Sequence, residues 1–309
     1  MLFCCEAKTQ TEYITNGSFE QIDSCYGSVA SIGFDVFAWA GCKGWSIPIK
    51  SSSDLWCENG KVGIISPPLI PSCGYQNPRT GANMAGILIG DNGYANYREY
   101  VQNKLTQTLK INKNYTIEFY LSKGVMPCTT NQFGVKFFNT KHNDATTYWL
   151  TNLTPDAEND ETNFITDTLG WQKVSLSYRA NGTENYIVIG CFADSLHLTL
   201  ESGCDTSGIG VSYIPGLGYF FIDDVSIIEK EMPELPNVFS PNGDGANDIW
   251  KAEFDEDVTF FIYNRWGNKV YEQKEKNIYW NGTNYNDGIY YYIINSNQYN
   301  YKGFIQLIK

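Results

Sequence analysis

Hydrophobic and polar residues along this chain alternate in short runs, unlike the three-to-four-residue spacing of an amphipathic helix. Alternation at every second position predicts strands with one face against a core and the other in solvent. Clusters of Gly and Asn, which favour turns, separate the runs. The predicted strands lie at 115–121, 133–138, 171–178, 186–191, 219–227, 258–263, 269–271, 288–294 and 304–308. Residues 97–109 fit a helix and a strand equally well, and the pattern as a whole predicts an all-β protein.

The segment 230–236 interrupts this pattern with charged residues and prolines. Such a composition suits a short, semi-rigid linker. We therefore expect a leader remnant at 1–12, a first β domain at 13–229, the linker at 230–236 and a second β domain at 237–309. Short strands joined by Gly-rich turns form sandwiches, so a β-sandwich or jelly roll is the fold expected for the first domain.

Composition narrows the class of protein without changing this picture. Hydrophobic residues make up 42% of the 309 residues and aromatic residues 15%, which fits a folded, sheet-rich chain. The net charge of −12 repels phosphate backbones, so nucleic acid is not an expected partner. No apolar run is long enough for a transmembrane helix.

The chain has nine cysteines, all before residue 205, and from Cys25 onward none stands in a C-x-x-C metal knuckle. Widely spaced cysteines of this kind favour disulfides formed in an oxidising compartment. Spacing does not fix the connectivity. Proximity in sequence suggests the pairs Cys25–Cys42, Cys57–Cys73 and Cys191–Cys204, with Cys128 left over.

The first residues lack the basic segment and the full apolar core of a signal peptide. They are either the end of such a leader or an ordinary terminus. In the first case Cys4 or Cys5 is a candidate for lipid modification.

Catalytic signatures are missing from the sequence. The two histidines, His142 and His197, stand in no metalloprotease motif, and no nucleophile elbow or phosphate-binding Gly loop occurs. The expectation is a protein that is not an enzyme. A glycosidase needs only two facing carboxylates, so a small glycan-active hydrolase stays an alternative, with Glu99, Glu118 and Asp194 as candidates.

The last part of the chain carries several motifs in a fixed order. They are LPNVFSPNGDGANDIW at 235–250, FIYNRWGNKVY at 261–271, YWNGT at 279–283, GIYYYII at 288–294 and YKGFIQLIK at 301–309. Gly, Asn and Asp in PNGDG and NRWGN are typical of turns. The PNGDG loop also suggests a calcium ligand set, but without the distal Glu of an EF-hand a structural turn is the better interpretation.

Together these motifs resemble the gliding-motility-associated C-terminal domain of Bacteroidetes, the type B sorting signal of type IX secretion. The resemblance implies a small Ig-like β-sandwich, export across the outer membrane, a location at the outer cell surface, and the type IX secretion machinery as partner. It also implies that the last strand is an edge to which that machinery adds a strand. This sorting signal comprises Lys302, Gly303, Phe304, Ile305, Gln306, Leu307, Ile308 and Lys309.

Two segments of the first domain, NGSFE at 16–20 and YFFIDDVSI at 219–227, resemble the two ends of carbohydrate-binding-module-like, galactose-binding-type jelly rolls. The resemblance implies that they lie side by side and hold a structural calcium. Its ligands would be Asn16, Gly17, Glu20 and either Asp223 or Asp224. Adjacent residues of a strand point to opposite faces, so only one of the two aspartates could bind.

A sugar-binding surface needs exposed aromatic rings, which stack on the apolar face of a pyranose. The loop-located candidates are Trp39, Trp56, Tyr94, Tyr97 and Trp149. The leading hypothesis is an exported, non-catalytic binding or adhesion protein whose jelly roll contacts glycan or another surface component. The alternative from a different class is a structural, gliding- or matrix-associated protein that binds other proteins.

Overall fold

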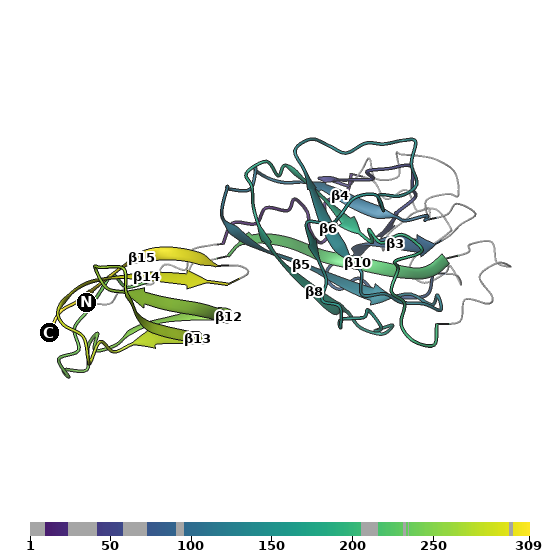
Figure 1. Ribbon diagram of the computed structural model, residues 1–309. Helices are drawn as coiled ribbons and strands as arrows, with labels where there is room; N and C mark the ends of the chain where they lie inside the picture. Colours follow the sequence, from purple (N-terminus) through teal and green to yellow (C-terminus); the bar gives the residue numbers. More distant parts are fainter. Residues whose placement is uncertain are drawn as a thin grey trace. The chain divides into compact units, whose positions relative to one another are not determined.

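The computed structural model describes residues 10–23, 42–57, 73–90, 96–204, 216–230, 233, 235–296 and 299–309, and gives only the backbone of Asp255. The chain divides into two compact units, Met1–Lys230 and Glu231–Lys309, so the division falls inside the expected linker. Figure 1 shows both units, and each is described by itself below. Within the described residues every regular element is a strand, and no helix is long and apolar enough to cross a membrane.

The described residues of unit 1 (Met1–Lys230) form two antiparallel five-stranded sheets. The first contains, in order, β2 (Asp54–Cys57), β3 (Asn83–Gly90), β10 (Gly216–Glu229), β5 (Asn114–Lys123) and β8 (Gln172–Arg179). The second contains β1 (Trp45–Ser46), β4 (Tyr100–Lys104), β9 (Tyr186–Gly190), β6 (Gly134–Phe138) and β7 (Ala157–Glu158). From β3 to β6 and from β7 to β10, successive strands alternate between the sheets (Figure 1), as in a jelly roll.

The space between the two sheets holds the core of unit 1. In β5, Ile117 and Phe119 are fully buried and Glu118 between them is not, so the predicted alternation is present. Val135 of β6 and Ile189 of β9 belong to the same apolar cluster, although they come from the other sheet. Each such side chain contributes about 2 kcal/mol of hydrophobic free energy. The predicted β-sandwich is therefore confirmed.

The sequence pattern missed the short strands β1, β2, β7 and, in unit 2, Val238–Phe239, and it also missed the long strand β3. All eight residues of β3 are buried, because Ile87 faces the core between the sheets while Leu88 faces an apolar cluster on the outer side of the first sheet. A strand that is covered on both faces shows no alternation of polar and apolar residues. The ambiguous segment 97–109 contributes the strand β4.

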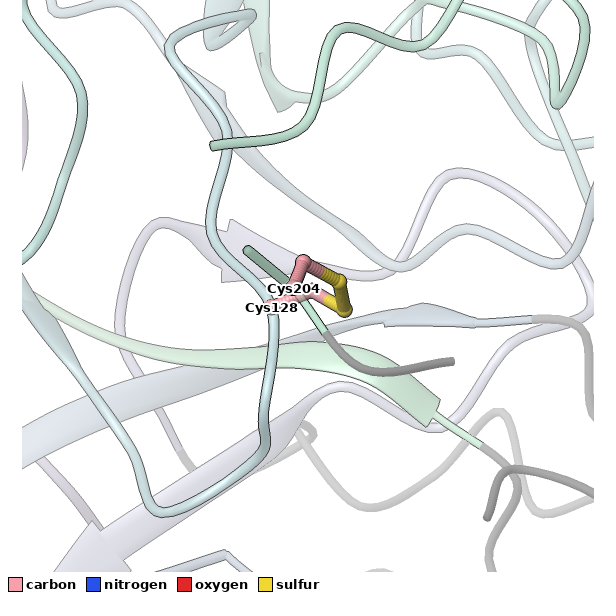
Figure 2. Close-up of a disulfide and its surroundings, with 2 residues drawn as sticks. All are labelled: Cys128 and Cys204. Atoms are coloured by element: carbon pink, nitrogen blue, oxygen red, sulfur yellow. A yellow bond between two sulfur atoms is a disulfide. The ribbon is translucent and has the colours of Figure 1, made fainter. Parts of the chain in front are cut away.

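A disulfide joins Cys128 and Cys204 across 76 residues of sequence (Figure 2). The expectations that Cys128 is left over and that Cys204 pairs with Cys191 are therefore wrong. Cys191 follows β9 and is a buried thiol in the core. Cys128 instead lies beside the start of β10, where its N–H donates to Leu217 O at 2.9 Å.

The other two guessed pairs are also wrong. Cys42 is a buried thiol, so it does not pair with Cys25, which lies outside the described residues. Cys57 is disulfide-bonded, whereas Cys73 keeps its thiol. Proximity in sequence failed even for Cys57, which ends β2, and Cys73, which precedes β3, although β2 and β3 are paired neighbours in one sheet.

Unit 2 (Glu231–Lys309) is one five-stranded sheet. Its order is β11 (Val238–Phe239), β15 (Asn300–Leu307), β14 (Gly288–Asn295), β12 (Trp250–Tyr263) and β13 (Lys269–Trp280). The β12–β13 ladder shifts between Glu253 and Val258, and the Trp250 ring stacks on Phe260 with centroids 4.8 Å apart. Ten positions of straight strand would separate these rings by roughly 30 Å. The sheet therefore bends over its own core, which also buries Trp280.

Candidate functional sites

The two segments that resemble the ends of a jelly roll do lie side by side. Tyr13 N donates to Ile227 O at 2.9 Å, and Val225 N donates to Gly17 O at 3.0 Å. A Cβ on Gly17 would lie 1.9 Å from Val225 O, so only glycine allows this approach. Asn16 turns the chain at a φ of 56°, which asparagine tolerates well.

Glu20 extends from this turn to the start of β3. Its carboxylate accepts hydrogen bonds from Ala82 N at 3.0 Å and from Asn83 N at 2.8 Å, and also from Asn83 Nδ2 at 3.2 Å. A predicted calcium ligand thus holds the segment that leads into β3.

Asp223 holds the same segment a few residues earlier. Its Oδ2 accepts hydrogen bonds from Arg79 N at 2.8 Å and Thr80 N at 3.2 Å, and its Oδ1 accepts one from Asp224 N at 2.7 Å. Asp223 is fully buried, and burial together with the charge of Asp224 raises its pKa to about 7. Asp224 turns to the other side, where it forms an ion pair with Arg79.

We call this arrangement the clasp, meaning Glu20, Asp223, Asp224 and the segment 79–83 that they hold. The carbonyl oxygens that would complete a calcium shell are also engaged, since Asn16 O accepts from Trp45 Nε1 at 2.7 Å and Gly17 O from Val225 N. In the described ranges no group of three Asp, Glu, His or Cys side chains is arranged so that it could hold a metal ion. The carboxylate oxygens of Glu20 and Asp223 all accept hydrogen bonds from N–H donors, and calcium at this site stays a prediction.

Two of the predicted sugar-stacking rings belong to the core. Trp56 is 4% exposed and donates to Tyr219 OH at 2.9 Å, and Tyr97 is 6% exposed and donates to Glu99 at 3.0 Å. Both pack in the apolar cluster on the outer side of the first sheet, so the expectation that they are exposed platforms is wrong. Trp39 and Tyr94 lie outside the described residues.

Trp149 is half-buried and stays a candidate. It lies in the 139–156 segment, which crosses the outer face of the second sheet. Leu150 N donates to the buried Tyr100 OH at 3.1 Å, and Thr147 O accepts from Lys50 N at 3.0 Å. These contacts fix the loop on either side of the indole.

A buried polar network that was not predicted lies beside Trp56 and Tyr97. The Glu99 carboxylate accepts from Ser52 Oγ and Leu88 N, each at 2.9 Å, and burial raises its pKa. Asp54, two positions before Trp56 in β2, accepts from Tyr219 OH at 2.6 Å. Period-two spacing was the one available signal, because it places Asp54 and Trp56 on the same face of the strand.

The carboxylates considered for a hydrolase all have their own partners. Glu99 is 3% exposed within the network just described. Glu118 forms an ion pair with Lys173 at 2.6 Å on the outer face of the first sheet. Asp194 accepts from His197 Nδ1 at 2.7 Å in an exposed turn.

The PNGDG loop of unit 2 is a turn closed by its own polar groups. Both oxygens of Asp248 accept backbone hydrogen bonds, from Gly243 N at 2.7 Å and Gly245 N at 2.9 Å. The contacts match the structural-turn interpretation of this motif.

The predicted sorting segment 302–309 does not form a simple edge. β15 pairs with β14 on one side and, at Gln306 and Leu307, with β11 on the other. Gln306 N donates to Asn237 O at 2.8 Å and Ile308 N to Phe239 O at 3.1 Å. The end of β15 is therefore covered by the two-residue strand that follows the linker, a pairing that the sequence pattern did not show.

Residues 233–307 match the family described as the CHU_C Type IX secretion signal domain. This match covers all five strands of unit 2 and confirms the resemblance of the C-terminal motifs. No curated protein matches the chain.

Several solved structures are similar in fold. The Clostridium thermocellum xylanase 10B CBM22-1–GH10 modules, complexed with xylohexaose, share 10% identity over 74% of this chain and 30% of that chain, with a TM-score of 0.35. The CBM22-1 xylan-binding domain of Paenibacillus barcinonensis Xyn10C shares 9% identity over 62% and 88% of the two chains, with a TM-score of 0.32. The N-terminal cellulose-binding domain of Cellulomonas fimi β-1,4-glucanase C shares 11% identity over 52% and 86%, with a TM-score of 0.28.

Proposed function

We propose that the chain is exported by the type IX secretion machinery and acts at the outer cell surface as a non-catalytic binding or adhesion protein. The match of residues 233–307 to a type IX secretion signal domain carries the proposal. In this proposal unit 2 directs export and surface attachment, and unit 1 contacts glycan or another surface component.

The covalent structure of unit 1 supports a location outside the cytoplasm. The Cys128–Cys204 disulfide ties the segment before β6 to the segment that precedes β10. Disulfides persist mainly in oxidising compartments, which an exported protein reaches. This observation is independent of the motifs in unit 2.

The glycan contact is proposed for the outer face of the second sheet, beside Trp149. Next to this loop, Gln102 of β4 holds His142, donating to its carbonyl at 3.1 Å and accepting from its N–H at 2.9 Å. These contacts hold the loop in place, and the half-buried indole of Trp149 offers a stacking surface for a sugar ring. The non-catalytic part of the proposal is supported by Glu99, whose carboxylate is buried and already hydrogen-bonded.

Export is tested by expressing the full chain, and a chain that ends at Lys230, in a bacterium with an active type IX secretion machinery. Only the full chain is expected at the cell surface or in the medium. Equal export of the shortened chain would refute the role of unit 2.

Glycan binding is tested with the full chain on a glycan array. Trp149→Ala should abolish retention, whereas Tyr75→Ala, which removes an exposed ring of unit 1, should not. If no sugar is retained and a surface protein is captured instead, the structural or matrix protein is the correct class. Polysaccharide turnover that disappears in Glu99→Gln would establish the hydrolase.

A further inference from the structure

One edge of unit 2 is open for only part of its length. Gln306 N donates to Asn237 O, just before β11, and Ile308 N donates to Phe239 O of β11, so the N–H groups of these even-numbered residues point away from β14. Because backbone direction repeats at every second residue of a strand, the N–H and C=O groups of Lys302 and Phe304 point the same way. These groups have no hydrogen-bond partner within the described part of the chain.

The course of the linker explains why only the end of β15 has a pairing strand on this side. β11 pairs only with Gln306 and Leu307, and the residue before Asn237 is a proline, which has no N–H to donate. The carbonyl of Pro236 accepts the hydrogen bond of the buried Trp250 indole instead. Trp250 thereby draws the chain over the core and away from β15, which leaves residues 302–304 uncovered.

The sheet face beside this edge is apolar and exposed. Phe304 is 46% exposed and stands opposite Tyr291, which is 51% exposed. Ile289 and Val238, which flank Gln306 on the same face, are 49% and 43% exposed. Lys302 is the one charged residue of β14 and β15. An exposed apolar patch with a polar rim is typical of a protein-binding surface.

We propose that residues 302–304 of β15 receive one extended strand from a protein of the export machinery. The inference rests on the proposed function and assigns its docking site. Outward backbone groups at strand spacing require a strand as partner, since a helix has satisfied its own backbone groups. On the shared face, the incoming strand presents an acidic residue beside Lys302 and, two positions away, an apolar residue beside Phe304 and Tyr291. The segment 306–308, already paired with β11, is not part of the site.

The test uses the full chain with Lys302→Pro. Residue 302 directs its N–H outward, so proline removes a bond to the incoming strand without removing one to β14. Lys302→Ala is the matched control that keeps the backbone edge. Proline removes one backbone hydrogen bond to the incoming strand and blocks the edge sterically. The exported amount should therefore fall to about one tenth of the wild-type amount or less. Lys302→Ala removes only the exposed ion pair between Lys302 and the incoming strand, so it should lower export far less.

A photoreactive phenylalanine analogue at position 304 identifies the contact during export. It should form an adduct with an envelope protein that the same group at position 279 does not form, because Tyr279 is equally exposed (51%) but lies on β13. The adduct at 304 should be absent when Lys302→Pro is added. If Lys302→Pro shifts the melting of unit 2, Phe304→Thr replaces it, because threonine keeps strand propensity and removes the apolar contact.

Three outcomes overturn the proposal. Normal export of folded Lys302→Pro and Phe304→Thr shows that the edge is not used. An adduct between two copies of this chain, or a dimer in light scattering that Lys302→Pro disrupts, assigns the edge to self-association. Equal adducts at 304 and 279 show that contact is unspecific. Failure of the proposed function is distinguishable, because then the chain ending at Lys230 is exported as well as the full chain.

Discussion

The clasp should make the stability of unit 1 depend on pH through Asp223. This carboxyl has an ordinary pKa of 3.8, which burial and the charge of Asp224 raise to about 7 in the folded chain. Between these values the unfolded chain has lost the proton and the folded chain has kept it. The contribution to stability is therefore fully present below about pH 4 and is lost as the pH rises through about 7.

The magnitude follows from the same two pKa values. Each pH unit in this window lowers the free energy of unfolding by about 1.4 kcal/mol, and the whole window by about 4 kcal/mol. The N–H donors of Arg79, Thr80 and Asp224 act in the opposite direction, because they favour the ionised carboxylate. The sign of the pH dependence thus decides whether burial or hydrogen bonding dominates at Asp223.

The perturbation is Asp223→Asn, which removes the titration. The amide keeps an acceptor for Arg79 N and Thr80 N, while its NH₂ group opposes Asp224 N at a cost that does not vary with pH. The assay is urea unfolding of the full chain between pH 5 and pH 8 in the presence of a chelator. Relative to the variant, the wild-type unit 1 should lose about 2 kcal/mol from pH 5 to pH 7, because the slope flattens as the pH reaches the folded pKa.

A difference that is constant or grows with pH would refute the reasoning, because it would mean that the buried carboxylate is ionised throughout. Asp224→Asn is the matched control. It removes the neighbouring charge that raises the pKa of Asp223, so it should make the wild-type slope shallower without abolishing it.

The remaining predictions concern the disulfide, the core of unit 2 and calcium. Replacing Cys128 and Cys204 with serine should destabilise unit 1 by about 4 kcal/mol, because the disulfide closes a long loop, and reducing agent should then have no further effect on melting. Trp250→Ala should cost about 4 kcal/mol in the unfolding of unit 2, since the fully buried indole stacks on Phe260. If the clasp holds calcium, the ion should raise the melting temperature of the wild type but not of Glu20→Gln; equal shifts exclude this site.

Their controls are substitutions at matched positions. Trp266→Ala, at a tryptophan that is 71% exposed, should leave unit 2 stable. A small loss for Trp250→Ala would show that the bent sheet does not close over this ring. The serine variant and the reduced wild type are expected to have the same melting temperature. If reduction does not change the melting temperature of the wild type, the disulfide does not contribute to stability.

Much of the fold could be predicted because most strands of this chain have one covered and one exposed face. β5, β8 and β14 alternate as expected, and their residues could be placed before any pairing was known. β3 could not be recognised in this way, because both of its faces are covered. The cysteine pairs could not be predicted from spacing, because Cys128 and Cys204 meet although 76 residues separate them in sequence.

The candidate sites were harder to predict than the strands. Composition points to aromatic residues in loops, but it does not tell whether a loop presents the ring or folds it inward. Trp56 and Tyr97 are buried because other segments cover the outer side of the first sheet, whereas Trp149 lies on a loop that is itself the cover.

Unit 2 shows most clearly what can be predicted from the sequence and what depends on the tertiary structure. The sequence by itself predicted a type IX secretion signal domain at 237–309, because turn residues and aromatic strands in a fixed order are local features, and residues 233–307 match that family. Only the tertiary structure decided which part of that tail is open to a partner. Pro236 and Trp250 lie far from β15 in sequence, and their hydrogen bond turns the linker away from Lys302 and Phe304. A contact between distant segments sets the accessible edge, and no local pattern encodes it.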